Sequence, residues 1–159
     1  MFGNTALIQQ NLQHVGNGRN ASQRRYRAAQ AFWQAYFQAS LHALWARLMG
    51  RNTHLESLHA AANEHSNGRR LPGVQIIPIS QIRGSEGRSQ DFDVAFRPRQ
   101  PHNLDRWVNI AVARDRGVPL PPVDLIQVGH IYYVRDGHHR ISVAHIQGQA
   151  DIEAHVTVW

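Results

Sequence analysis

Apolar positions in the N-terminal third of the chain follow a helical period. Residues 20–49 contain neither proline nor glycine, and apolar side chains recur there every three or four positions. This pattern predicts one long helix over 20–50, capped by Asn20 or Ser22 and ended by Gly50. Short helices are expected over 5–14 and over 53–62, where Thr53-His54-Leu55-Glu56 has the capping-box pattern. The apolar positions of the long helix are Tyr26, Ala29, Trp33, Tyr36, Phe37, Leu41, Leu44 and Leu48.

The pattern changes after a polar, turn-rich segment at 63–73. We interpret that segment as a boundary between an N-terminal helical region, residues 1–66, and a second domain, residues 74–159. Short apolar runs and one amphipathic stretch then alternate, which predicts a compact α+β domain with a small mixed sheet and no internal repeat. The expected elements are a strand at 74–78, a loop-rich passage at 80–99, a helix at 102–116, strands at 123–128 and 131–135 around a Gly129-His130 turn, a helix at 138–147 and a strand at 152–158.

The amino-acid composition excludes several kinds of catalytic chemistry and favours one class of binding partner. The 159 residues include 17 Lys+Arg, all of them arginine, against 11 Asp+Glu, for a net charge of +6. The absence of lysine excludes a phosphate-loop lysine, a Schiff base and a lysine general base. The absence of cysteine excludes thiol nucleophiles, thiolate metal sites and disulfides. The positive charge favours anionic partners such as nucleotides or nucleic acid.

The sequence pattern predicts neither a secretory signal nor a membrane-spanning segment. Residues 1–10 lack the basic start and apolar run of a secretory signal, and no apolar stretch approaches membrane-spanning length. We therefore expect a cytoplasmic protein without a membrane partner.

Candidate chemistry concentrates where a strand turns into a helix at residues 132–144. Gly137 allows close backbone approach, and the N-terminal end of the following helix favours an anion. Arg140 can pair with phosphate oxygens, His138 or His139 can move a proton, and Asp136 can hold a divalent cation. The alternative is a tight Asp136-Gly137 turn followed by solvated side chains at the start of a helix.

The residues Val128 to Ala144, with DGHHR at 136–140, resemble the ParB/sulfiredoxin superfamily, in its ParB-like nuclease branch. The resemblance extends to Ile77-Pro78-Ile79-Ser80-Gln81-Ile82 and to the proline segment at 118–123, and it covers roughly Val74 to Val158. Members of this superfamily include CTP-dependent DNA-partition proteins, nucleases, ATPases and a free-serine kinase. Sulfiredoxin chemistry requires a cysteine that this chain lacks.

The resemblance implies a phosphate-binding role for Gly137, His138, His139 and Arg140, with Asp136 at the mouth of the site. Kinase-like members use a glutamate near the first strand as a base, and Glu86 is the glutamate closest to that place. The implied function is binding of nucleotide or nucleic-acid phosphates with metal-assisted phosphodiester or nucleoside-triphosphate hydrolysis. Asp136 would then hold Mg²⁺, Arg140 would neutralise developing charge, and His138 or His139 would serve as acid or base. The nucleotide would be one such as ATP or CTP.

The alternative function is a non-enzymatic module that senses nucleotide or binds DNA and changes its oligomeric state. Two-metal nucleases gather several carboxylates, whereas Asp136 is the one obvious carboxylate within the motif. Other charged residues of the loop-rich passage, either lining the site or solvated, are Arg88, Asp91, Asp93 and Arg97.

Three further patterns have simpler explanations. Residues 22–29 echo the GERRYRAA-type nucleotide box of ParB proteins, but no strand precedes them, so we interpret them as a basic helix start. No strand precedes the glycine pattern at 16–21, and no acidic residue follows it until Glu56, so we interpret it as a turn. The histidines that invite a zinc hypothesis form no HExxH motif; they are His130, His138, His139, His145 and His155.

Aromatic residues are spread broadly around the long helix, which suggests that a second surface, that of another copy of the chain, covers part of it. We therefore expect a homo-oligomer formed through the N-terminal helices. The arginines at the start of that helix either contact nucleic-acid phosphates or are solvated. They are Arg19, Arg24, Arg25 and Arg27.

Overall fold

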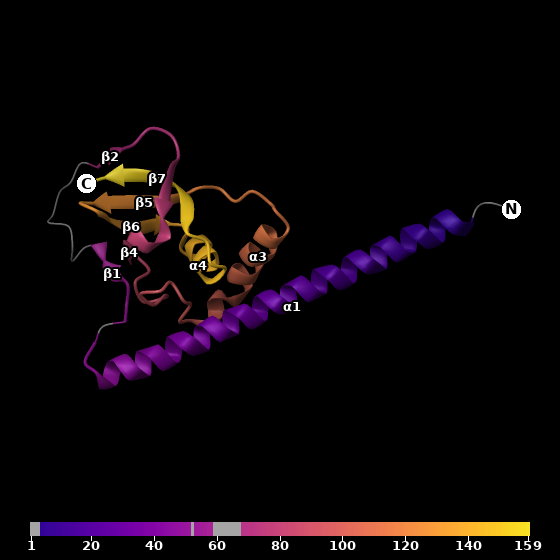
Figure 1. Cartoon of the computed structure of the whole chain (residues 1–159), viewed down its shortest axis with the longest axis horizontal. Helices are drawn as coiled ribbons and strands as arrows, with labels where there is room; N and C mark the ends of the chain where they lie inside the picture. The colour runs from indigo at the N-terminus through magenta and orange to yellow at the C-terminus, as the bar shows by residue number, and fades with distance from the viewer. Residues whose placement is uncertain (1–3, 52, 59–67) are drawn as a thin grey trace.

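A mixed β-sheet flanked by helices forms the body of the protein, and one long helix lies against it (Figure 1). The computed structural model describes residues 4–51, 53–58 and 68–159, with side chains from residue 20 onward. The strands are β1 (Glu56–Ser57), β2 (Arg69–Arg70), β3 (Gln75–Pro78), β4 (Ile82–Ser85), β5 (Val123–Val128), β6 (Ile131–Asp136) and β7 (Asp151–Val158). The helices are α1 (Asn4–Leu48), α3 (Leu104–Asp115) and α4 (His138–Ile146), with short 3-10 turns at Ile79–Gln81 and Pro101–Asn103.

The sheet has the strand order β1-β4-β6-β5-β7-β2, and β3 also pairs with β7. The β5–β6 hairpin is antiparallel and confirms the predicted turn at Gly129-His130, with Val128 opposite Ile131. The β4 strand is parallel to β6, and β5 is parallel to β7. The predicted α+β class with a small mixed sheet is confirmed. Because β4 and β6 run in the same direction, the chain leaves both strands at the same edge of the sheet.

The main core lies between the sheet and α4. Its fully buried side chains include Val134 of β6 and Ile141 of α4. A second cluster joins the three helices, in which the rings of Phe32 in α1 and Trp107 in α3 meet edge to face with centroids 5.8 Å apart. Both rings are fully buried, so truncating Phe32 to alanine costs about 3–5 kcal/mol. The indole of Trp107 also donates a hydrogen bond to Ser142 of α4 at 3.0 Å.

The long helix differs in two ways from the sequence expectation. Residues 4–48 form one continuous helix, so the turn expected at 16–21 is wrong, and the short helix expected over 5–14 is part of α1. Glycine costs about 1 kcal/mol in a helix interior relative to alanine but does not by itself break the helix. The predicted end is confirmed, since α1 stops at Leu48 and Gly50 has a φ of 65°. The N-terminal part of α1 extends beyond the sheet (Figure 1).

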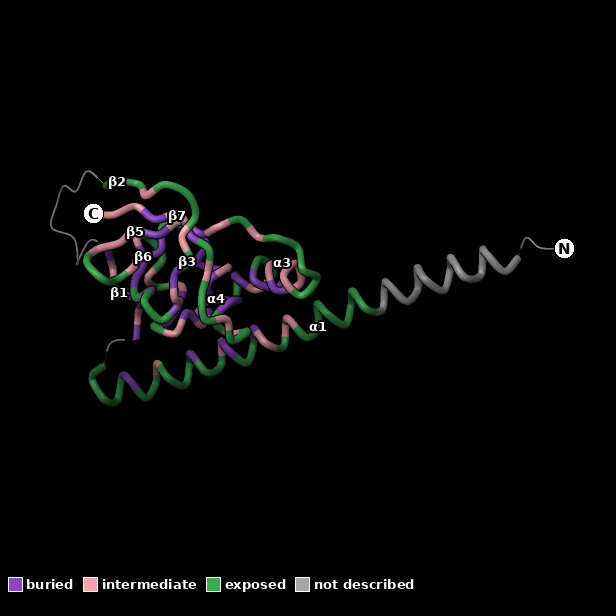
Figure 2. Tube along the Cα trace, turned by 45° about the horizontal axis from the view of Figure 1, so that its top comes forward, coloured by how far each residue is buried: buried purple, intermediate pink, exposed green. Residues whose placement is uncertain are grey.

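Polar contacts fix the middle of α1 to α3. Arg24 forms an ion pair with Asp115 at 3.0 Å, and Arg25 donates to the side-chain oxygen of Asn109 at 2.9 Å. These two arginines therefore have partners within the protein. Figure 2 shows α1 as mostly exposed over its coloured length, with buried positions spaced along it.

The helix expected over 53–62 is wrong at its start. Glu56 and Ser57 form β1, which is parallel to β4, and the Glu56 carboxylate accepts a hydrogen bond from the Tyr133 hydroxyl at 3.1 Å. Residues 53–56 match a capping box in sequence, but Glu56 does not cap a helix. It belongs to a strand, and its carboxylate has a hydrogen-bond partner on β6. Residues 59–62 lie outside the described residues.

The loop-rich passage at 80–99 contains β4, a strand that the sequence pattern did not predict. Its Ile-Arg-Gly-Ser sequence is short, and a side chain at Gly84 would overlap the ring of Tyr133. Glycine in this strand therefore permits close packing on β6 rather than signalling a loop. Within the described part of the chain, no helix is both long enough and apolar enough to span a bilayer.

Candidate phosphate-binding site

The candidate site begins where β6 passes into α4 through Gly137. This glycine has a φ of 100°, and a Cβ built on it would lie 2.5 Å from Cγ1 of Val123. Both the backbone conformation and the contact require glycine. No described side chain caps α4, and its first turn carries no acidic residue. The N–H groups at the start of α4 thus form an end of positive potential that can accept an anion.

A pocket of about 290 Å³ opens at this helix end. Three segments line it: the residues that follow β4, one face of α3, and the β6–α4 junction. The lining includes four arginines and two carboxylates, so positive charge predominates. The lining residues are Glu86, Gly87, Arg88, Arg106, Ile110, Arg135, Asp136, Gly137, His138, His139 and Arg140.

Glu86 and residues 136–140, which the sequence indicates for this site, all line the same pocket, whereas Asp91, Asp93 and Arg97 are not in its lining. Glu86 reaches it because β4 is parallel to β6, and the Glu86 amide donates to the Val134 carbonyl at 3.0 Å. Its carboxylate forms an ion pair with Arg135, with Oε2 and Nε 3.0 Å apart. A position 50 residues upstream of Asp136 therefore belongs to the same site.

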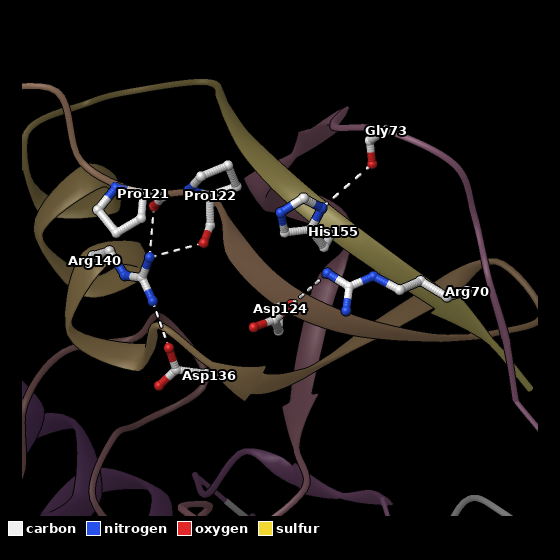
Figure 3. Close-up of polar contacts among 8 residues, drawn as sticks. All are labelled: Arg70, Gly73, Pro121, Pro122, Asp124, Asp136, Arg140 and His155. Carbon is white, nitrogen blue, oxygen red and sulfur yellow. Dashed lines mark hydrogen bonds and ion pairs between the residues drawn. The ribbon is translucent and has the colours of Figure 1, made fainter.

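Arg140 has extensive contacts within the protein (Figure 3). Its Nη1 donates to the carbonyls of Pro121 and Pro122 at 2.5 and 2.8 Å, and its Nη2 pairs with Asp136 Oδ2 at 2.6 Å. The Arg140 side chain is only 14% exposed. These contacts hold the proline segment against the start of α4, so Arg140 organises the site besides contributing charge to it. Figure 3 also shows the ion pair between Arg70 of β2 and Asp124 of β5, two strands that lie on either side of β7; its N–O distance is 3.7 Å.

His138 is buried and neutral. Its Nε2 lies 2.7 Å from the hydroxyl of Ser85, which itself accepts the backbone N–H groups of Arg88 and Gly87 at 2.8 and 3.3 Å. With those two donors directed at its oxygen, the hydroxyl donates its proton to His138, which places the ring proton on Nδ1. Burial, with help from the positive charge of Arg88, lowers the pKa of His138 to about 4.

His139 is also buried and neutral. Arg88 Nη1 donates to its Nε2 at 3.3 Å, and its Nδ1 is buried with no hydrogen-bond partner among the described residues. Burial and the charges of Arg106 and Arg88 lower the pKa of His139 to about 4. The ring of Phe92 stacks on His138 and meets His139 edge to face. Near neutral pH both imidazoles are therefore neutral, and neither carries the extra proton that a general acid would donate.

The other two arginines that are not paired with a carboxylate of the pocket are Arg106 and Arg88. Arg106 forms no hydrogen bond or ion pair with any residue that the structure describes. Arg88 is 43% exposed and lies 3.8 Å from Asp91, at the outer limit of an ion pair. Asp93 and Arg97 pair with each other and do not line the pocket; the buried Asp93 accepts the backbone N–H groups of Ala95 and Arg97.

The donor set does not fit a resident divalent cation. Asp136 and Glu86 are each paired with an arginine, and the pocket holds an excess of guanidinium groups. Across the described ranges, no three histidine or acidic side chains gather in a way that could hold a metal ion. The histidines considered for zinc are therefore not brought together into such a group.

Sequence reasoning missed Ser85, Arg106 and Arg135. Ser85 lies in the unpredicted strand β4, and Arg106 lies on the helix face that the periodicity marks as polar. Arg135 was visible as the residue before DGHHR, but its partner Glu86 is distant in sequence. A correct prediction of β4 parallel to β6 would have placed Ser85 and Glu86 beside the motif.

No protein-family model matches this chain, and no curated protein matches it. Among solved structures, the crystal structure of sulfiredoxin from Arabidopsis thaliana is similar, with 20% sequence identity and a TM-score of 0.41. The alignment covers 54% of this chain and 84% of that one.

Proposed function

We propose that the pocket at the start of α4 binds the phosphate groups of a nucleotide or of nucleic acid. The observation that carries this proposal is the convergence of four arginines on an uncapped helix N-terminus. Arg135 and Arg140 are paired with Glu86 and Asp136, which leaves the charges of Arg88 and Arg106 to attract an anion. The resemblance of residues 136–140 to the DGHHR members of the ParB/sulfiredoxin superfamily supports the same class of ligand.

The residues divide into two roles in this proposal. Gly137, His138, His139 and Arg140 offer main-chain N–H groups at the first turn of α4. Arg88 and Arg106, which have weak or no ion pairs among the described residues, supply the guanidinium groups that reach the ligand. Arg140 and Arg135 hold Asp136 and Glu86 in place.

Hydrolysis of a phosphodiester or nucleoside triphosphate is the enzymatic form of this proposal. Glu86 is the candidate general base that takes a proton from water. Nε2 of His138 and Nε2 of His139 already accept hydrogen bonds within the protein, and a pKa of about 4 makes each imidazole a weak base. The lowered histidine pKa argues against either imidazole as the acid. Since the described residues form no cation site by themselves, we propose that Mg²⁺ would arrive bound to the phosphates, with Asp136, whose side chain is 60% exposed, as its protein ligand.

A non-enzymatic, oligomeric binding module is the second candidate, and an exposed apolar stripe on α1 favours it. The stripe residues are each 46–75% exposed, and residues 28–46 carry no formal charge. Aromatic side chains bury roughly 150–250 Å² each, so pairing two such stripes would reach the area of a standard interface, about 800 Å² per partner. The stripe residues are Tyr26, Trp33, Phe37, Leu41, Leu44, Trp45 and Leu48.

Thermal stabilisation tests the binding proposal. The wild-type chain is heated with ATP, CTP, GTP, inorganic phosphate or short DNA, with and without Mg²⁺, because a ligand that binds only the folded state raises its melting temperature. We expect a saturable rise that is lost in Arg106→Gln and kept in Arg83→Gln, which removes an equal charge from outside the pocket. Equal responses of the two variants would contradict the proposal.

An assay for hydrolysis products then distinguishes the enzyme from the non-enzymatic binding module. Hydrolysis that tracks the wild-type chain and disappears in Asp136→Asn, with binding retained, supports the enzyme. Binding without product, accompanied by a change in oligomer mass, supports the non-enzymatic module.

A further inference from the structure

A second basic cavity lies at the C-terminal end of α1. Its volume is about 470 Å³, and it lies between the C-terminal end of α1, the segment that follows, and the loop before α3. The polar side chains in its lining are Ser40, Arg47, Arg51, Thr53, His54 and Arg99. It shares no lining residue with the pocket at α4.

The charged side chains that line this cavity, among the described residues, are all positive. Three guanidinium groups line it, and no carboxylate does so among the described residues. Arg47, Arg51 and Arg99 form no ion pair with any carboxylate in the described ranges, whereas six other arginines do. Because arginine stays protonated at all accessible pH values, the repulsion cannot be relieved by deprotonation.

His54 does not neutralise the cluster. Arg99 Nη1 donates to its Nδ1 at 2.6 Å. Burial and the nearby charge of Arg99 lower the pKa of His54, although a hydrogen bond to the backbone of Ser89 acts the other way. His54 therefore positions the Arg99 guanidinium at the cavity without adding or removing charge.

A structural role explains only part of the arrangement. Arg47 lies in the last turn of α1, where a cation is stabilised by the helix dipole. That effect does not account for Arg99, which comes from the loop before α3, some 50 residues further along the chain. Its convergence with Arg47 and Arg51 brings together donors that suit a multiply charged oxyanion.

We propose that this cavity is a second oxyanion site, which binds a phosphate group through Arg47, Arg51 and Arg99. The phosphate can come from a free compound or from a nucleic-acid backbone. The site is independent of the pocket at α4, so each can fail without the other.

The test follows arginine side chains directly. The full chain is labelled with ¹⁵N-arginine, and Nε–Hε resonances, assigned with single Arg→Gln variants, are monitored during titration with inorganic phosphate. We expect the Arg51 and Arg99 resonances to move together along one saturating curve. The exposed Arg83 serves as the internal control, and sodium chloride at matched ionic strength controls for screening.

The possible results distinguish a failure of the second site from a failure of the pocket at α4. Arg51 and Arg99 resonances that stay still, or that change without saturation as Arg83 does, overturn the second site. Saturation at Arg99 with no response at Arg88 and Arg106 upholds the second site and contradicts the first. The response at Arg99 is expected to survive in Arg106→Gln.

Affinity for a short single-stranded oligonucleotide and for a mononucleotide then identifies the source of the phosphate. If the double variant Arg51→Gln/Arg99→Gln lowers the affinity for the oligonucleotide about tenfold and leaves the affinity for the mononucleotide unchanged, the site binds a nucleic-acid backbone. Equal weakening of both assigns it to a free phosphate compound. No weakening of either overturns the proposal.

Discussion

The hydroxyl of Ser85 lies 2.7 Å from Nε2 of His138 and joins the end of β4 to the first residue of α4. The same oxygen accepts the backbone N–H groups of Gly87 and Arg88. One buried side chain therefore sets the ring orientation of His138 and the path of the loop that carries Glu86 and Arg88 to the pocket.

Ser85→Ala is expected to destabilise the fold by about 1–3 kcal/mol, because it leaves buried polar groups without partners. The measurement is the free energy of unfolding in urea. Ser80→Ala, at an exposed position, is the matched control and is expected to change it by less than about 0.5 kcal/mol. Equal values for the two variants would show that the Ser85 contacts contribute nothing measurable.

Stability should depend on pH through His138 and His139. The unfolded chain takes up these protons near pH 6.5 and the folded chain only near pH 4, so the unfolded state binds more protons between those values. The free energy of unfolding is therefore expected to fall as the pH drops from about 6.5 to about 4, by on the order of 3 kcal/mol for each histidine.

Urea unfolding at several pH values checks this dependence. His138→Gln and His139→Gln are each expected to flatten the decline, since they remove one titrating group. His130→Gln, at an exposed turn, is the control. A profile unchanged by both buried substitutions would contradict neutral, buried imidazoles.

Gly137→Ala combines an unfavourable backbone conformation with a clash against Val123. We expect a loss of about 2 kcal/mol or more. Gly129→Ala separates the two causes, because Gly129 also has a positive φ, 61°, but nothing lies within 4 Å of the added Cβ. Its loss should be near 1 kcal/mol. If the two variants lose the same stability, the contact with Val123 has no energetic effect.

The apolar stripe on α1 is expected to hold a second copy of the chain. Light scattering after gel filtration should give a multiple of the 18.0 kDa chain mass. Phe37→Glu/Trp45→Glu places charges in the stripe and should yield monomer with unchanged helix content by circular dichroism. Gln81→Glu/Gln90→Glu is the matched control, with equal added charge at exposed polar positions outside α1. A monomeric wild type would refute the self-pairing.

Elements with strong periodicity were predicted correctly from the sequence. The long helix, the β5–β6 hairpin and the strand-to-helix turn at Gly137 all follow from local patterns that tertiary contacts reinforce. The pocket could be predicted only in part, because its DGHHR half is local whereas its other half depends on pairing over long sequence separations. Glu86 and Ser85 reach it through β4, a strand whose four residues lack a hydrophobic alternation.

The helix expected at Thr53 failed for a related reason. Its capping-box letters satisfy a local rule, but Glu56 finds a hydrogen-bond partner in Tyr133, 77 positions away. A local signal of about 1 kcal/mol is outweighed when the same residues can pair with a sheet edge. The lowered pKa of the two histidines likewise depends on burial that no local pattern reveals.

We propose that a phosphate group binds at the first turn of α4. The most direct measurement follows the backbone amide resonances of His138, His139 and Arg140 by NMR while ATP or inorganic phosphate is added. We expect downfield amide proton shifts that saturate with the ligand and disappear in Arg106→Gln. Saturable binding that leaves these three amides unmoved would contradict the claim and place the ligand elsewhere on the protein.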